Sequence, residues 1–180
     1  RKEEPEVDKP EDEEKETLSE EWVILFTGHK IDQKGEIEER RFLPEMEQEA
    51  RKRIDTALDK FEIDDNDIGV TAGAACGGDI IFIEACLDRG MDVEVHLPFS
   101  EPQYIKQNVS PAGDQWVERF YNLRNHPNVN INFQLDHVGK VKAGDDAYKR
   151  NNRWALYSSL LLGIDRVRLL TLWDGKSTAT

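Results

Sequence analysis

A run of small residues carries the first sign of chemistry in this sequence. Residues 70–79 read Val-Thr-Ala-Gly-Ala-Ala-Cys-Gly-Gly-Asp, between a short apolar stretch typical of a buried strand and a stretch at 80–90 typical of a helix. Small residues let a ligand approach the backbone, and the N–H groups of a helix's first turn attract anions. We therefore predict a site for a phosphate-bearing small molecule. The loop residues assigned to it are Thr71, Gly73, Gly77 and Gly78.

The glycine spacing matches neither the G-x-G-x-x-G dinucleotide fingerprint nor a Walker A loop, because no Gly-Lys-Ser/Thr follows. A tight turn that serves only packing is therefore the alternative to a ligand site. Asp79 likewise has two interpretations. Its carboxylate either caps the helix that follows or accepts hydrogen bonds from ribose hydroxyls.

Glu84 is the one charged residue in the apolar helix predicted after the loop, over residues 80–87. A carboxylate in such surroundings needs a partner or a shifted pKa. One interpretation is a salt bridge to Arg166 or Lys52. The other is a catalytic acid.

Polar residues also follow other predicted strands. Thr27, Gly28, His29 and Lys30 follow an apolar run at 22–26, and Trp173 and Asp174 follow another at 166–172. Arg41 adds a guanidinium group that can grip phosphate with two hydrogen bonds. Asn152 lies inside a predicted helix, where asparagine is unfavourable unless its amide finds a hydrogen-bonding partner. We assign all of these residues to the ligand site.

Strands alternate with helices along the whole chain. The predicted strands cover 22–26, 67–70, 93–97, 129–135 and 166–172, with 129–135 at an edge because polar and apolar residues alternate there. This alternation predicts an α/β fold, a doubly wound, mostly parallel, five-stranded Rossmann-like sheet with helices on both faces. Ligands of such sheets bind beyond the carboxyl ends of the strands, where the residues assigned above gather.

Charge is uneven along the 180 residues, whose net charge is −13. Residues 1–21 hold 11 acidic and 4 basic side chains with almost no apolar ones, which is typical of a disordered linker. The chain begins with Arg1, so we expect a piece of a longer protein, with the folded domain at 22–180. The acidic balance argues against general nucleic-acid or anionic-membrane binding.

Cysteine use and hydropathy indicate a cytoplasmic protein. Cys76 and Cys86 are the only cysteines, and their spacing suits neither a metal site nor a disulfide framework. No signal peptide is recognisable, and no apolar run approaches the ~20 residues that span a bilayer. We find no cluster with metal-ligand spacing and predict no metal site.

Five segments in order resemble the SLOG superfamily, the Rossmann-like group that contains DNA-processing protein A and the LOG phosphoribohydrolases. They are Phe26-Thr27-Gly28-His29-Lys30, Arg41-Phe42-x-Pro44, residues 73–85 with their three glycines and Glu84, Leu97-Pro98-Phe99, and Trp173-Asp174-Gly175-Lys176. The likeness runs from about Trp22 to Lys176. It is strongest to the bacterial branch attached to tetratricopeptide repeats or signalling domains.

The resemblance implies a nucleotide or NAD-derived ligand such as ADP-ribose, with no further cofactor required. It implies a sensor module, whose partners are other domains of the same chain and, as a further option, a second copy in a homo-oligomer. LOG enzymes carry Pro-Gly-Gly-x-Gly-Thr-x-x-Glu, of which only Gly77-Gly78 and Glu84 are echoed here. That favours binding over hydrolysis. A nucleotide N-glycosidase with Glu84 or Asp79 as its acid, and a domain that only binds other proteins, are the alternatives.

Overall fold

A single parallel sheet organises the computed structural model, which describes residues 21–33 and 41–176. Its strands are β1 (Val23–Gly28), β2 (Ile68–Thr71), β3 (Asp92–Leu97), β4 (Val129–Phe133) and β5 (Val167–Leu172). They pair in the order β4-β3-β2-β1-β5, and every pairing is parallel. The predicted fold class is confirmed, including the edge position of β4. The predicted acidic linker lies, apart from Glu21, outside the described residues.

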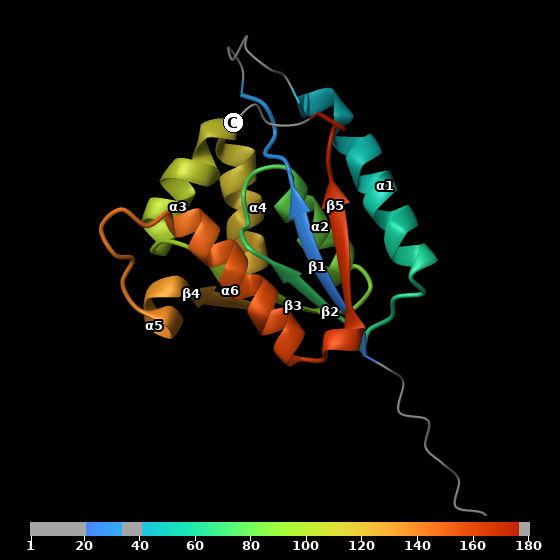
Figure 1. The fold of residues 1–180 in the computed structure, drawn as a ribbon. Coiled ribbons are helices and arrows are strands. Elements are labelled where there is room, and N and C mark those ends of the chain that lie inside the picture. Colours follow the sequence, from blue (N-terminus) through green and yellow to red (C-terminus); the bar gives the residue numbers. More distant parts are fainter. Residues whose placement is uncertain (1–20, 34–40, 177–180) are drawn as a thin grey trace, which may run out of the picture.

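Helices cover both faces of this sheet (Figure 1). They are α1 (Glu47–Lys60), α2 (Gly78–Leu87), α3 (Glu101–Asn108), α4 (Asp114–Arg124), α5 (Gln134–Val138) and α6 (Ala147–Leu161), with the 3₁₀ turns η1 (Pro44–Met46), η2 (Ser110–Ala112) and η3 (Ile164–Arg166). In Figure 1, α2 and α4 lie behind the sheet, α1 lies beside β5 and packs against α2, and α6 crosses in front. Right-handed crossovers explain this, because the chain steps from β1 out to β4 and then returns to the far side of β1. The strand order reverses beside β1, so loops diverge there and leave room for a ligand.

The core divides along the same two faces. Ile24 and Phe26 of β1 point toward α2, where the rings of Phe26 and Phe82 stack with centroids 4.5 Å apart. Val23 and Leu25, the alternate residues of the same strand, pack with Ala155 of α6. Helix α2 is apolar almost all round because the sheet, α1 and α4 enclose it.

Local sequence explains where α6 begins and where β4 ends. Asp146 caps α6 by accepting hydrogen bonds from the backbone N–H groups of Tyr148 and Lys149. The predicted strand at 129–135 ends at Phe133, since Gln134 begins α5. The segment after β3 is helical in α3. Within the described part of the chain, no helix is long and apolar enough to cross a membrane.

Candidate functional site

A cavity of about 360 Å³ opens at the carboxyl ends of β1 and β2. The loop after β1, the loop after β2, helix α3 and helix α6 all contribute walls. Its lining residues are Phe26, Thr27, Gly28, Lys30, Ala72, Ala75, Asp79, Tyr104, Asn108, Tyr148 and Asn152. We call it the rim cavity. It brings together five of the residues that the sequence assigned to a ligand site: Thr27, Gly28, Lys30, Asp79 and Asn152.

Asn108 of α3 organises the polar side of the rim cavity. Its side-chain carbonyl oxygen Oδ1 accepts hydrogen bonds from Lys30 Nζ and from the Tyr148 hydroxyl, each over 3.2 Å. Asn108 itself is buried, and its Nδ2 donates to the carbonyl oxygen of Tyr104 over 3.3 Å. The exposed Lys30 is therefore held at the cavity by a fixed anchor, with ammonium protons left over for a ligand.

Asp79 lies in the same cavity and does not cap α2 with its side chain. The helix begins after Gly77, and one Asp79 carboxylate oxygen accepts a hydrogen bond from the N–H of Ala75 over 3.2 Å. Burial raises the pKa of Asp79 to about 6, against the lowering effects of that N–H and of the Lys30 cation. The carboxyl group therefore changes protonation state in a range where few carboxyl groups do, and it can accept or donate a hydrogen bond accordingly.

The glycine loop, the run of small residues at 70–79, packs against the segments that line the rim cavity. The N–H of Ala74 donates to the Tyr104 hydroxyl, that of Cys76 to the carbonyl of Asn108, and that of Gly78 to the carbonyl of His29. These three amide groups, in the loop where free N–H groups were expected, are thus hydrogen-bonded within the protein. Thr71, Gly73, Gly77 and Gly78 are all buried.

Close packing explains the small residues of this loop. Gly77 has φ +115°, and a Cβ there would lie 2.5 Å from the backbone nitrogen of Ile31. A Cβ on Gly73 would lie 2.6 Å from the Tyr104 hydroxyl oxygen. The loop shapes the site, and side chains from α3, α6 and the β1 loop supply its polar surface.

Four further residues that the sequence assigned to the ligand site line a second cavity, of about 260 Å³, between the end of β5 and the start of α1. They are His29, Arg41, Trp173 and Asp174. We call this cavity the β5-end cavity. It is lined by His29, Arg41, Phe42, Met46, Glu49, Ala50, Arg53, Leu172, Trp173 and Asp174. His29 Nε2 lies 3.7 Å from Asp174 Oδ1, and Arg41 Nε lies 3.9 Å from Asp174 Oδ2. The N–H of Lys176, which donates to the Asp174 carboxylate, and the nearby Arg41 and His29 side chains keep the pKa of Asp174 below its usual value.

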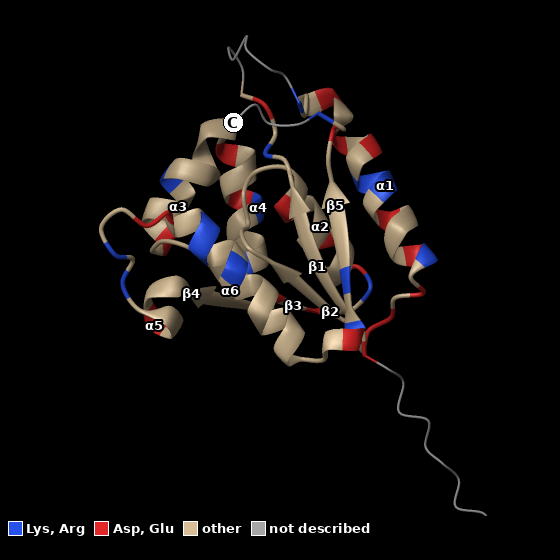
Figure 2. Ribbon diagram, viewed as in Figure 1, with Lys and Arg blue, Asp and Glu red and all other residues tan. Residues whose placement is uncertain are grey.

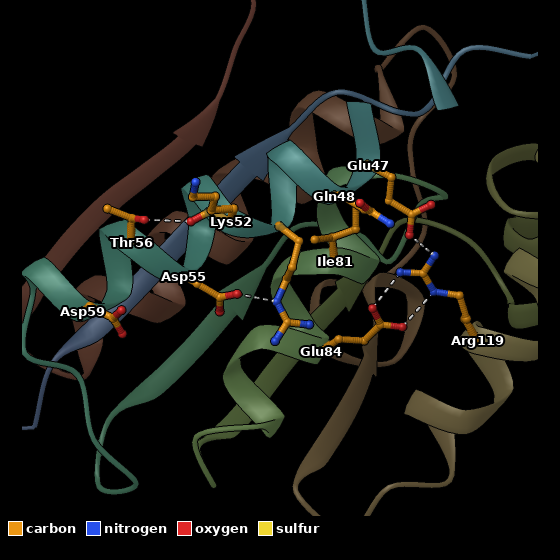
Figure 3. Close-up of a pocket in the computed structure, with 10 residues that line it drawn as sticks. Glu47, Gln48, Lys52, Asp55, Thr56, Asp59, Ile81, Glu84 and Arg119 are labelled. Atoms are coloured by element: carbon orange, nitrogen blue, oxygen red, sulfur yellow. Dashed lines mark hydrogen bonds and ion pairs between the residues drawn. The ribbon is translucent and has the colours of Figure 1, made fainter. Parts of the chain in front are cut away.

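Glu84 lies elsewhere, on the surface of α2 that faces α1 and α4 (Figure 3). Its carboxylate pairs with Arg119 through two hydrogen bonds of 2.8 and 2.6 Å, and Arg119 also reaches Glu47 over 2.6 Å. Arg119 of α4, and neither Arg166 nor Lys52, is thus the partner that the sequence left undetermined. Glu84 does not line the rim cavity.

A larger cavity, of about 570 Å³, lies beside this ion pair, between α1, α2 and α4. Opposite charges alternate along α1 in Figure 2, and they pair across the cavity in Figure 3. Arg51 pairs with Asp55 over 2.9 Å and with Asp88 over 2.5 Å. Because its cationic and anionic groups already neutralise one another, this surface presents little unmatched charge to a ligand.

Two residues of the rim cavity, Tyr104 and Asn108, escaped the sequence interpretation. They lie on α3, in a segment without a recognisable motif. The helical spacing of a buried aromatic and a buried amide was the only available signal. Asn151, which precedes the predicted Asn152 in α6, donates from its Nδ2 to the carbonyl oxygens of Ala72 and His96 over 2.9 and 2.8 Å.

Across residues 21–33 and 41–176, no three His, Cys, Asp or Glu side chains come together in a way that would hold a metal ion. Comparison with known proteins gave no matching family model, no matching curated protein and no matching solved structure.

Proposed function

We propose that this chain binds a nucleotide or an NAD-derived ligand such as ADP-ribose at the carboxyl ends of its strands, and that it serves as a ligand-sensing module of a larger protein. The observation that carries the proposal is the rim cavity. It opens beyond the carboxyl ends of β1 and β2, the edge of the sheet at which ligands of open α/β sheets bind, and β1 is one of the two strands between which the strand order reverses. At about 360 Å³ it falls within the ~300–1,000 Å³ common for small-molecule sites.

The polar groups of the rim cavity suit a sugar phosphate. Lys30 offers a cation with spare donors for phosphate oxygens. Asp79 offers a carboxyl group that can hydrogen-bond ribose hydroxyls. Asn152 and Tyr148, both exposed at the start of α6, add donors and acceptors at the mouth.

The arrangement also supports a sensing role. Four segments that are far apart in the sequence line the rim cavity: the β1 loop, the β2 loop, α3 and α6. A ligand that contacts all four stabilises their mutual positions, and it favours whichever conformation of the protein has them so placed. Neighbouring domains of the same chain are the proposed recipients of that change.

Calorimetric titration of the 180-residue chain with AMP, ADP-ribose and NAD tests the proposal. We expect saturable binding of at least one of them at one site per chain. Chromatography of the same mixtures should return the ligand intact, whereas released base would favour the N-glycosidase alternative. Absence of binding by all three at millimolar concentration contradicts the proposal.

A second candidate function, self-association, has its own observation. Leu161, Ile164 and Leu169 are 87%, 72% and 62% exposed, at the end of α6, on η3 and on β5. Strand β5 pairs only with β1 in the described sheet, so its outer edge is open. Large exposed apolar residues beside an open edge favour contact with another copy. Sedimentation velocity tests this: a concentration-dependent dimer that Leu161→Ser weakens supports it, and a monomer at all concentrations contradicts it.

A further inference from the structure

We infer that the β5-end cavity is a nucleobase subsite and that it selects adenine. This inference rests on the proposed function, because it assigns the base of the proposed nucleotide to a cavity next to the one that suits its sugar phosphate. Gly28 and Lys30 line the rim cavity, and His29, between them, lines the β5-end cavity. The two cavities therefore lie on either side of one short stretch of backbone.

Two buried polar atoms of residues that line this cavity, His29 Nε2 and Asp174 Oδ2, have no hydrogen-bond partner among residues 21–33 and 41–176. Arg41 Nε lies 3.9 Å from Asp174 Oδ2, an ion pair that is longer than a hydrogen bond. The distance of 3.7 Å from His29 Nε2 to Asp174 Oδ1 is longer than a hydrogen bond. Buried polar atoms are nearly always paired, so two unpaired ones lining the same cavity point to a ligand that completes them.

The walls of the cavity suit a flat ring. Phe42, Leu172 and Trp173 contribute apolar and aromatic surface. The Trp173 ring is 62% exposed, yet its Nε1 donates to the carbonyl oxygen of Lys176 over 2.8 Å, which fixes its orientation. The volume of about 260 Å³ is below the ~300 Å³ at which sites for whole ligands begin, so the cavity suits a single ring system. A base can stack on the exposed indole face.

The two unpaired atoms select among the bases. The Asp174 carboxylate, with its lowered pKa, only accepts hydrogen bonds, and His29 donates when its proton is on Nε2. Adenine presents an amino group beside a ring nitrogen that accepts, which matches an acceptor next to a donor. Hypoxanthine held in the same orientation as adenine presents a carbonyl oxygen in place of that amino group, and the carbonyl would then face a carboxylate with no proton between them.

The test compares AMP, IMP and ribose 5-phosphate by calorimetry on the wild-type chain, Asp174→Asn and Asp165→Asn. Asp165 is the matched control, an exposed carboxylate at the opposite end of β5. We expect AMP to bind wild type at least tenfold tighter than IMP. In Asp174→Asn the amide oxygen keeps the hydrogen bond from Lys176 and its NH₂ group replaces the unpaired oxygen. The AMP-to-IMP preference should therefore disappear or reverse, and Asp165→Asn should keep it.

Fluorescence gives a readout that needs no phosphate. Adenosine should quench the emission of the wild-type chain, and Trp173→Phe should remove that quenching, because the indole face is the stacking surface. Equal affinities for AMP, IMP and ribose 5-phosphate would overturn the base subsite while leaving the proposed function standing. Adenosine quenching without any binding of ribose 5-phosphate would keep the base subsite and count against the phosphate role of the rim cavity. If none of these probes binds, both proposals fail.

Discussion

The backbone N–H of Ala74 donates a hydrogen bond to the hydroxyl oxygen of Tyr104 over 2.9 Å, in the buried interior between the glycine loop and α3. Burial raises the pKa of that hydroxyl far above the usual value, so it stays protonated. The loop is thereby fixed to a helix 30 residues further along the chain.

Removing this hydroxyl should destabilise the fold. Tyr104→Phe leaves the Ala74 N–H buried without an acceptor, which costs about 1–3 kcal/mol. Urea unfolding should show this loss, whereas Tyr157→Phe, at a tyrosine that is 61% exposed, should change the free energy of unfolding by less than about 0.5 kcal/mol. Equal stabilities of the two variants would mean that the hydrogen bond contributes nothing.

Gly77 and Gly113 form a matched pair for the packing of the loop. Their φ angles are +115° and +112°, but an added Cβ meets the backbone of Ile31 at Gly77 and nothing within 4 Å at Gly113. Gly113→Ala should cost only the backbone strain, about 1–3 kcal/mol. Gly77→Ala should cost at least about 2 kcal/mol more or prevent folding, because backbone must move. Thermal unfolding followed by circular dichroism measures both, and similar melting temperatures would refute the packing role.

Asn151 provides a third prediction, about the junction between α6 and the sheet. Its side chain is fully buried and donates to two strand-end carbonyl oxygens. Asn151→Ala leaves both carbonyls buried and unpaired, and we expect a loss of about 2–4 kcal/mol in the free energy of unfolding. The neighbouring Asn152→Ala, at an exposed position of the same helix, is the control and should lie within about 0.5 kcal/mol of wild type. A loss below 1 kcal/mol for Asn151→Ala contradicts the structural role.

Asp79 predicts a particular pH dependence. Its pKa is about 6 in the folded protein and near ~3.9 in the unfolded chain, so between these values the folded state binds the extra proton. Ionisation therefore reduces stability as pH rises from about 4 to about 6, and the effect is constant above that range. Asp79→Asn cannot ionise, so its stability relative to wild type should increase across the same interval. A difference that is independent of pH would show that the folded-state pKa is not raised.

The sequence predicted the fold well because its signals are local. The apolar runs that became β1 and β5 each depend on a few neighbouring positions. A parallel sheet predicts a ligand site at the carboxyl ends of its strands, and both cavities lie there. The ion-pair partner of a charged residue, by contrast, does not depend on neighbouring positions in the sequence. Glu84 pairs with Arg119, 35 positions away on another helix, and no pattern in the sequence names that partner.

The glycine loop shows the same limit at the site itself. A run of small residues predicts close approach of something to the backbone, and a ligand or the protein's own chain satisfies that pattern equally. In the structure the protein's own chain takes this place. The Tyr104 hydroxyl and the Asn108 carbonyl oxygen, both from α3, accept hydrogen bonds from loop N–H groups that a phosphate would otherwise contact. Lys30 and Asp79 were found because residue type and strand-end position agreed, and Asn152 because an asparagine inside a helix needs a hydrogen-bonding partner.

The most direct test of the account is AMP affinity in two lysine variants, measured by calorimetry at fixed ionic strength. Lys30→Met removes the cation of the rim cavity, and Lys60→Met removes an exposed one at the far end of α1. A charge-assisted hydrogen bond to phosphate contributes about 1.5–3 kcal/mol, so Lys30→Met should weaken AMP binding about tenfold or more. Lys60→Met should bind within about twofold of wild type. Equal affinities of the two variants for AMP would contradict the assignment of the rim cavity as the phosphate site.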